Sequence, residues 1–270
     1  MNRKLIAIDL DGTTLNPQSN ITLKTQAVFQ KAKQAGHIIS IATGRPYRSS
    51  KHYYTQLEMD TPMVNFNGAL CHLPNEAQWS AQYHKTLDRD IALSMLDLKK
   101  EFDIQLIAAE LQNTVYADEN YLPYPDFFPN GQKETLKLSA ANLKEDPTSV
   151  CVFTAKENQA FITNKIIQRY GDLVEVRTWG GQSPCLEVVA AGVQKAMGVE
   201  RIASVYGIKQ QDIVAFGDED NDYEMIQYAG HGVVMQNGIE ALKDIANDIT
   251  EKTNAEDGLA HYLEDYLGLI

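Results

Sequence analysis

Two acidic residues follow an apolar run near the start of the chain, which we predict to be a buried strand. Residues 4–8 (KLIAI) are followed by DLDGT at 9–13. Alternation along an extended chain places Asp9 and Asp11 on the same side, so their carboxylates converge where the strand ends. Like charges this close need a cation or a proton between them. The pair is a candidate for metal binding or acid–base chemistry, and a polar strand end entering an Asp-Gly turn is the plainer alternative.

A second acidic segment also follows a predicted strand. GDEDND (217–222) comes directly after the apolar run at 213–216. An oxygen-rich cluster without a nearby His or Cys suits Mg²⁺ better than zinc. Its three aspartates match the first ligand positions of a calcium-binding EF-hand loop, but Tyr223 stands where that loop requires glycine, so the calcium interpretation fails. A purely structural loop or helix cap remains the alternative.

Two further positions could bind an anion. TGRP (43–46) follows the apolar run at 38–42, and it offers a hydroxyl, a flexible glycine and a guanidinium at a strand end. A helix entry with proline in its first turn has a similar sequence. Lys195 begins a predicted helix, although a lone lysine is most often an exposed, solvated side chain. The Asn67-Gly68 pair predicts a hairpin turn.

The elements around these residues alternate between strand and helix. Predicted strands cover 4–8, 38–42, 64–66, 213–216 and 232–235, and predicted helices cover 22–35, 195–206 and 222–228. Thr22 is the expected cap of the first helix, and Gly36 is its expected stop signal. This pattern indicates an α/β fold, a Rossmann-like doubly wound parallel sheet with helices on both faces.

The middle of the chain has less regular signals, and we predict a second, inserted domain there. The expected core is 1–82 together with 188–270, and the expected α+β insertion is 83–187, with hinges near 81–85 and 187–192. The segment 121–131 (YLPYPDFFPNG) holds three prolines and four aromatic residues. It is a candidate for substrate contact, and a packed surface loop is an equal alternative.

Composition restricts the partners and the compartment. The chain of 270 residues has 24 Lys and Arg against 36 Asp and Glu, a net charge of −12, which argues against nucleic acid or an anionic membrane as the main partner. The three cysteines form no CxxC pair, which favours a reducing compartment. The start of the chain lacks the pattern of a signal peptide, and no apolar run approaches the roughly 18 residues of a membrane span. The expected location is the cytoplasm.

In sequence order, these sites resemble the four motifs of the haloacid dehalogenase (HAD) superfamily. DLDGT is similar to the first motif, Thr43 to the second, Lys195 to the third and GDEDND to the fourth. The insertion resembles the type C2 cap. NFNGA (65–69), with TGRP and GVQK, is closest to the Cof-type subfamily IIB of sugar-phosphatase-like proteins. Ala196 departs from the family pattern, which usually has glycine there.

The resemblance implies a set of roles. Asp9 would be the nucleophile that forms an aspartyl-phosphate, and Asp11 would be the general acid and then the base. Thr43 and Lys195 complete the implied catalytic set. The implied substrate-binding residues are Leu10, Gly44, Arg45 and Asn221. The implied ligands of the cofactor Mg²⁺ are Asp9, the backbone carbonyl of Asp11, and Asp218, with Asp222 orienting the metal's surroundings.

The expected function is therefore a Mg²⁺-dependent phosphatase of small phosphorylated metabolites. Sugar phosphates are the leading substrates, and flavin mononucleotide and pyridoxal phosphate are alternatives. A phosphomutase or phosphotransferase on the same scaffold would need to clamp a second phosphate, and the insertion offers only Arg89, Arg169 and Arg177. A phospho-receiver or Mg²⁺-binding regulatory module is the third possibility, although receivers lack so large an insertion. The sequence predicts no particular oligomeric state.

Overall fold

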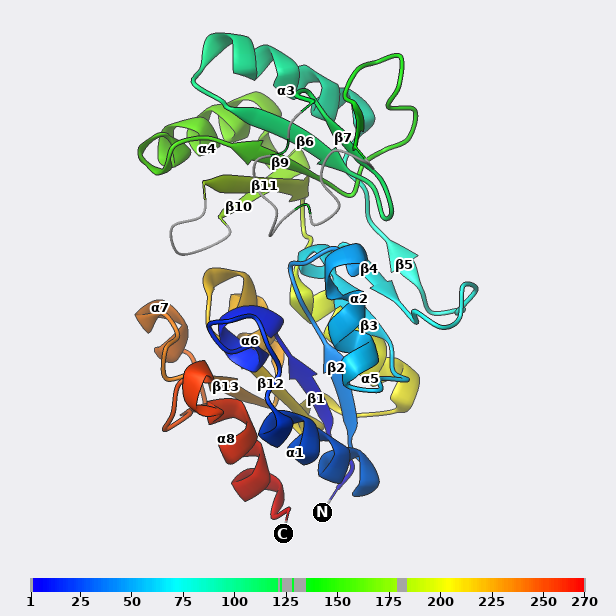
Figure 1. The fold of residues 1–270 in the computed structure, drawn as a ribbon, viewed down its shortest axis with the longest axis vertical. Coiled ribbons are helices and arrows are strands. Elements are labelled where there is room, and N and C mark those ends of the chain that lie inside the picture. The colour runs from blue at the N-terminus through cyan, green and yellow to red at the C-terminus, as the bar shows by residue number, and fades with distance from the viewer. Residues whose placement is uncertain (1, 121, 123–127, 129–134, 179–183, 270) are drawn as a thin grey trace. The chain divides into compact units, whose positions relative to one another are not determined.

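The computed structural model describes residues 2–120, 122, 128, 135–178 and 184–269 (Figure 1). The chain divides into two compact units. The first unit comprises Met1–Arg45, Ser50–Tyr83 and Gln194–Ile270, and the second comprises Pro46–Ser49 and His84–Val193. Each unit has its own sheet and its own apolar core.

The first unit is built on a five-stranded parallel sheet in the order β14-β13-β12-β1-β2. Its strands are β1 (Leu5–Ile8), β2 (Ile38–Ile41), β12 (Ile213–Gly217), β13 (His231–Val234) and β14 (Asp248–Ile249). The chain lays β2 on one side of β1 and later returns to the other side with β12, as Figure 1 shows. Ligands of doubly wound folds bind beyond the carboxyl ends of the strands at such a switch point. The expected α/β fold is confirmed.

The apolar runs form strands because both faces of this sheet are covered. Every residue of β1, β2 and β12 is buried, which explains why their sequences are continuously apolar rather than alternating. Leu5 and Ala7 of β1 share one core cluster with Val199 and Ile202, which belong to a helix on that face. The expected strands at 4–8, 38–42, 213–216 and 232–235 are therefore present, within a residue at each end.

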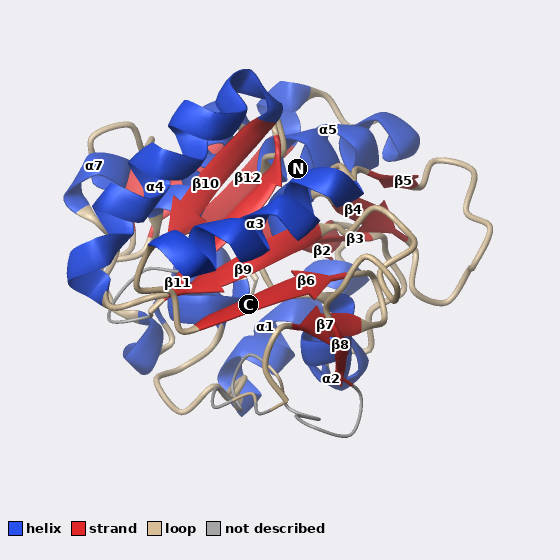
Figure 2. Cartoon of the chain, turned by 90° about the horizontal axis from the view of Figure 1, so that it is seen from above, coloured by secondary structure: helices blue, strands red, loops and turns tan. Residues whose placement is uncertain are grey.

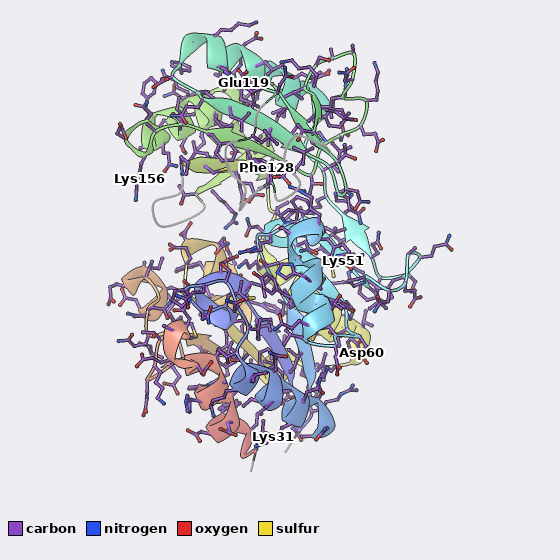
Figure 3. The ribbon with its side chains drawn as sticks, in the orientation of Figure 1. Lys31, Lys51, Asp60, Glu119, Phe128 and Lys156 are labelled. Atoms are coloured by element: carbon purple, nitrogen blue, oxygen red, sulfur yellow. The ribbon has the colours of Figure 1, made fainter. Side chains whose placement is uncertain are left out.

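Among the described residues, five helices lie wholly in the first unit, and a sixth, α2, lies in it from Ser50 onward. They are α1 (Leu23–Gln34), α2 (Tyr47–Gln56), α5 (Lys195–Tyr206), α6 (Tyr223–Tyr228), α7 (Glu240–Lys243) and α8 (Gly258–Leu267). Helix α1 packs beside α8, and α5 packs beside α6. Lys31 of α1, at the foot of Figure 3, forms an ion pair with Glu264 of α8. Thr22 caps α1 as expected, since its hydroxyl accepts a hydrogen bond from the backbone N–H of Thr25.

A small hairpin lies next to β2. It consists of β3 (Met63–Asn65) and β4 (Leu70–His72), which pair antiparallel, and β5 (Tyr83–His84) completes a three-stranded sheet. The expected turn at Asn67-Gly68 is confirmed. The expected strand at 64–66 instead ends at Asn65, because Phe66 has a φ of 50° and leaves the extended conformation.

The second unit contains a mostly antiparallel sheet in the order β10-β11-β9-β6-β7-β8. Its strands are β6 (Leu106–Glu110), β7 (Val115–Ala117), β8 (Thr135–Lys137), β9 (Ser149–Phe153), β10 (Val174–Thr178) and β11 (Cys185–Ala190). Helices α3 (Arg89–Glu101) and α4 (Lys156–Tyr170) cover one face (Figure 2). On the other face Phe128, labelled in Figure 3, packs near Phe153. Most of the segment 121–131 lies outside the described residues.

The remaining helical pieces are single turns. They span Leu10–Thr14, Phe66–Gly68, Gly171–Leu173, Gln210–Asp212, Asp220–Asp222 and Asn254–Glu256. None of the helices in the described part of the chain has the length and apolar character required to cross a lipid bilayer.

Candidate active site

Three carboxylates meet at the carboxyl ends of β1 and β12. Asp9 follows β1, and its backbone N–H donates to the carbonyl of Phe216 at 3.1 Å, so the two loops leave the sheet side by side. Asp9, Asp218 and Asp222 each offer an oxygen, and these three oxygens lie within 4.8 Å of one another. Adjacent parallel strands thus bring the first and fourth motifs together.

Lys195 lies between two of these carboxylates. Its side chain is fully buried, and its Nζ donates to Oδ1 of Asp9 and to Oδ1 of Asp222, each at 2.7 Å. Burial opposes the charge of the ammonium, but the attraction of Asp222 and Asp9 outweighs it, so the pKa of Lys195 is raised above its ordinary value. Lys195 is therefore a buried, charged member of the cluster, and the exposed lysine of the plainer interpretation is ruled out.

One buried lysine does not balance the negative charge. Burial raises the pKa of Asp9 to about 7, against the partial relief given by Lys195. Burial, followed by repulsion from Asp9 and Asp222, raises the pKa of Asp218 to about 8. Carboxylate oxygens are ligands that hard divalent cations such as Mg²⁺ prefer. The donor set and its excess negative charge therefore fit a magnesium ion.

Asp222 binds the backbone of its own loop in addition to Lys195. Its Oδ2 accepts hydrogen bonds from the backbone N–H groups of Asp218, at 2.9 Å, and Glu219, at 3.2 Å. Gly217 leaves the room that this arrangement needs, because a Cβ there would lie 2.4 Å from Cγ of Asp222. The buried Asp222 thus fixes the direction in which Asp218 and Lys195 present their charges.

The turn after β1 docks closely against Asp218. Gly12 has a φ of 72°, and a Cβ on it would lie 2.0 Å from Oδ2 of Asp218. The hydroxyl of Thr13 donates to Oδ1 of Asp218 at 2.8 Å, and the hydroxyl of Thr14 donates to the carbonyl of Asp9. Leu10 has a wholly buried side chain, so any contact between Leu10 and substrate involves its main chain.

Asp11 and Arg45 bind each other in this structure. The Arg45 guanidinium donates from Nε to Oδ2 of Asp11 at 2.7 Å and from Nη2 to Oδ1 at 2.5 Å. The side chain of Asp11 is 55% exposed, so it lies at the rim of the site, outside the buried cluster. The role expected of Asp11 in proton transfer requires this pair to open, because Arg45 holds both oxygens of the Asp11 carboxylate.

Thr43 and Gly44 lie in a loop that the β3–β4 hairpin holds. Thr43 is fully buried, and its N–H donates to the carbonyl of Val64 at 3.0 Å. Its carbonyl accepts from the N–H of Asn67 at 3.2 Å. Asn67 also contacts Asn221, whose Nδ2 donates to Oδ1 of Asn67 at 2.9 Å. The sequence indicated a turn at Asn67, and nothing local in it indicated a contact with the fourth motif.

Gly68 places the same hairpin against the start of α5. Its φ is 107°, and a Cβ would lie 2.1 Å from the carbonyl oxygen of Gln194, directly before Lys195. Gly36 has a comparable φ of 89° but no atom within 4 Å of such a Cβ. The two glycines therefore differ in the space around them and not in backbone conformation.

We expect Gly68→Ala to lower the free energy of unfolding by about 2–4 kcal/mol, because left-handed strain is added to a backbone clash. Gly36→Ala should cost only the strain, about 1 kcal/mol. Urea unfolding of the two variants measures the difference. Equal losses would show that the contact between Gly68 and Gln194 has no energetic weight.

Comparisons with known proteins identify the family of the chain. The chain matches the haloacid dehalogenase-like hydrolase family over residues 6–263. It is 40% identical over 268 residues to the 5-amino-6-(5-phospho-D-ribitylamino)uracil phosphatase YitU of Bacillus subtilis, with 98% of each chain covered. It is 29% identical over 294 residues to YwtE, a phosphatase of the same name from that organism, again with 98% of each covered.

A solved structure shows the same fold. It is the crystal structure of a haloacid dehalogenase-like hydrolase from Bacteroides thetaiotaomicron, with a TM-score of 0.83 and 22% identity, covering 98% of this chain and 100% of that one. The family match spans both sequence halves of the first unit and the second unit between them. The chain therefore belongs to the haloacid dehalogenase-like hydrolase family, as its motifs predicted, and it is a phosphatase.

Proposed function

We propose that this phosphatase hydrolyses small phosphorylated metabolites of the sugar-phosphate class, with Mg²⁺ as cofactor and an aspartyl-phosphate at Asp9 as intermediate. The observation that carries the proposal is the environment of Asp9, which is 5% exposed at the switch point of the sheet and has one oxygen held by Lys195. The substrate class is supported by YitU and YwtE, whose names specify a phosphorylated ribityl group, a sugar-alcohol phosphate.

The reaction begins with Asp9. One of its carboxylate oxygens attacks phosphorus, the bond from phosphorus to the ester oxygen breaks, and the leaving alkoxide takes a proton from Asp11. Asp11 then removes a proton from water, which attacks the phosphorus of the aspartyl-phosphate. Phosphate leaves and the Asp9 carboxylate is restored. Proton transfer requires Asp11 to leave its pair with Arg45, which frees that guanidinium for the substrate.

The other residues bind the phosphoryl group and stabilise its negative charge during both steps. Lys195 orients Asp9 and places a positive charge beside the phosphoryl group, and Thr43 and the N–H of Gly44 bind its oxygens. Mg²⁺, held by Asp9, Asp218 and the carbonyl of Asp11, would supply the positive charge that neutralises the phosphoryl oxygens. We assign the insertion predicted at 83–187 to a cap domain and 1–82 with 188–270 to the catalytic core, although β11 carries the sheet of the second unit on to Ala190 and that unit ends at Val193.

The metal requirement can be tested by chelation. We expect the protein to release many equivalents of p-nitrophenol and of free phosphate from p-nitrophenyl phosphate with Mg²⁺, without any bisphosphate activator. With EDTA the rate should fall by about 100-fold or more, because the site then repels the substrate dianion. An unchanged rate in EDTA would contradict the metal assignment, and a single stoichiometric burst would contradict a phosphatase and favour a receiver. Dependence on a bisphosphate would favour a phosphomutase.

A further inference from the structure

The turn between β3 and β4 has an unusual backbone. Three successive residues are left-handed: Phe66 has a φ of 50°, Asn67 of 53° and Gly68 of 107°. This conformation costs energy for residues other than glycine, and asparagine tolerates it better than most. Asn67 is also only 3% exposed, so its polar side chain is buried together with the strained backbone. The turn is held in this form by its contacts with other loops.

Asn67 contacts two loops that come from distant parts of the chain. Its backbone N–H donates to the carbonyl of Thr43 at 3.2 Å, and its Oδ1 accepts from Nδ2 of Asn221 at 2.9 Å. It also fills the space beside Gly44, since a Cβ on that glycine would lie 2.9 Å from Oδ1 of Asn67. One buried amide therefore lies between the Thr43–Gly44 loop and the loop that carries Asn221.

The hydrogen bond to Asn67 restricts the side chain of Asn221, which otherwise rotates about two bonds. A carboxamide with one N–H fixed on a buried acceptor points its other polar atoms in a defined direction. Glycine at position 67 would keep the left-handed backbone without strain but would remove the acceptor. Aspartate would keep an acceptor but would add a negative charge beside a site that must receive a phosphate dianion. Asparagine meets both requirements.

We propose that Asn67 is a positioning residue, whose side chain sets the direction of the Asn221 amide for binding of the phosphoryl group. The proposal rests on the proposed function and on the substrate-binding role that the family resemblance implies for Asn221. Asn67 acts through Asn221, so removing the Asn67 side chain should matter only while Asn221 is present.

A double-mutant cycle tests this dependence with p-nitrophenyl phosphate and Mg²⁺. We expect Asn67→Gly to lower kcat/KM roughly tenfold, mainly through a higher KM, because one hydrogen bond that orders a binding group is lost. In the Asn221→Ala background the same change should cost less than about twofold, since the group that it orients is gone. Equal losses in the two backgrounds, or no loss in either, would overturn the proposal.

Stability is compared with a matched glycine substitution. Glu58 is exposed, has a φ of 49° and lies in the turn two residues after α2 ends at Gln56. Glu58→Gly should leave kcat and KM unchanged. Its melting temperature gives the cost of replacing a left-handed, exposed residue by glycine, including loss of the surface hydrogen bond that Glu58 accepts from Gln30 at 3.0 Å.

A second measurement does not depend on turnover. The side-chain amide of Asn221, assigned in ¹⁵N-labelled protein, should shift in Asn67→Gly and keep its position in Glu58→Gly. An unshifted resonance would overturn the positioning role even if activity fell. Wild-type protein inactive on every phosphomonoester would instead overturn the proposed function, whereas an active wild type with an equally active Asn67→Gly variant would overturn this inference alone.

Discussion

Replacing Asp9 with asparagine is expected to abolish turnover and to leave the fold intact. The amide oxygen is a poor nucleophile, so kcat for p-nitrophenyl phosphate should fall by about 10⁴-fold or more. The amide has the same shape and still accepts the hydrogen bond from Lys195. Burial of the Asp9 charge raises its pKa, which means that the charge is costly in the folded state, so its removal should not lower the melting temperature.

The matched control for Asp9→Asn is Asp220→Asn. Asp220 belongs to the fourth motif but is exposed and lies outside the cluster of Asp9, Asp218 and Asp222. It should keep kcat within about twofold of the wild-type value. Steady-state rates and thermal melts of the two variants are the measurement. Near-normal turnover by Asp9→Asn would remove Asp9 from the mechanism.

The second large effect is expected at Lys195. Lys195→Met leaves Asp9 and Asp222 buried without their cation, and breaking a buried pair in this way costs about 3–5 kcal/mol of the free energy of unfolding. The rate should also fall by about 100-fold or more, since a positive charge beside the phosphoryl group is lost. Urea unfolding, and rates measured well below the melting temperature, separate the two effects.

A partly exposed ion pair provides the comparison for Lys195→Met. Lys24 of α1 pairs with Glu264 at 2.8 Å, with the two side chains 33% and 28% exposed. Lys24→Met should therefore change the free energy of unfolding by about 1 kcal/mol or less and leave the rate unaltered. If the two lysine variants lost the same stability, burial of the Lys195 pairs would have no energetic consequence.

Local signals were sufficient to predict much of the first unit. Strands β1 and β12 are buried on both faces, so each is a short, continuous apolar run that ends in acidic residues. Thr22 marks the start of α1 by its own side chain. Adjacent parallel strands end at the same edge, so the meeting of Asp9 and Asp218 follows from strand order alone.

Contacts between distant loops could not be predicted in this way. The hydrogen bond between Asn221 and Asn67 joins residues 154 positions apart, and the left-handed backbone at Phe66 has no local sequence signal. The pairing of Arg45 with Asp11 is a similar case, because each residue alone indicates a group that faces the substrate. The residues around Lys195 did not distinguish it from a surface lysine, so only its place in the order of the four motifs predicted a site residue. The structure places two buried carboxylates beside it.

The formation of an aspartyl-phosphate at Asp9 is the central claim, and chemical trapping tests it directly. Enzyme turning over a phosphomonoester with Mg²⁺ is quenched rapidly, treated with borohydride, which reduces an acyl phosphate to an alcohol, and digested for mass spectrometry. We predict homoserine at position 9 in the samples quenched during turnover. Samples that received no substrate, of the wild type or of Asp220→Asn, should keep unmodified aspartate at position 9. Unmodified Asp9 during turnover, or reduction at another carboxylate, would contradict this account.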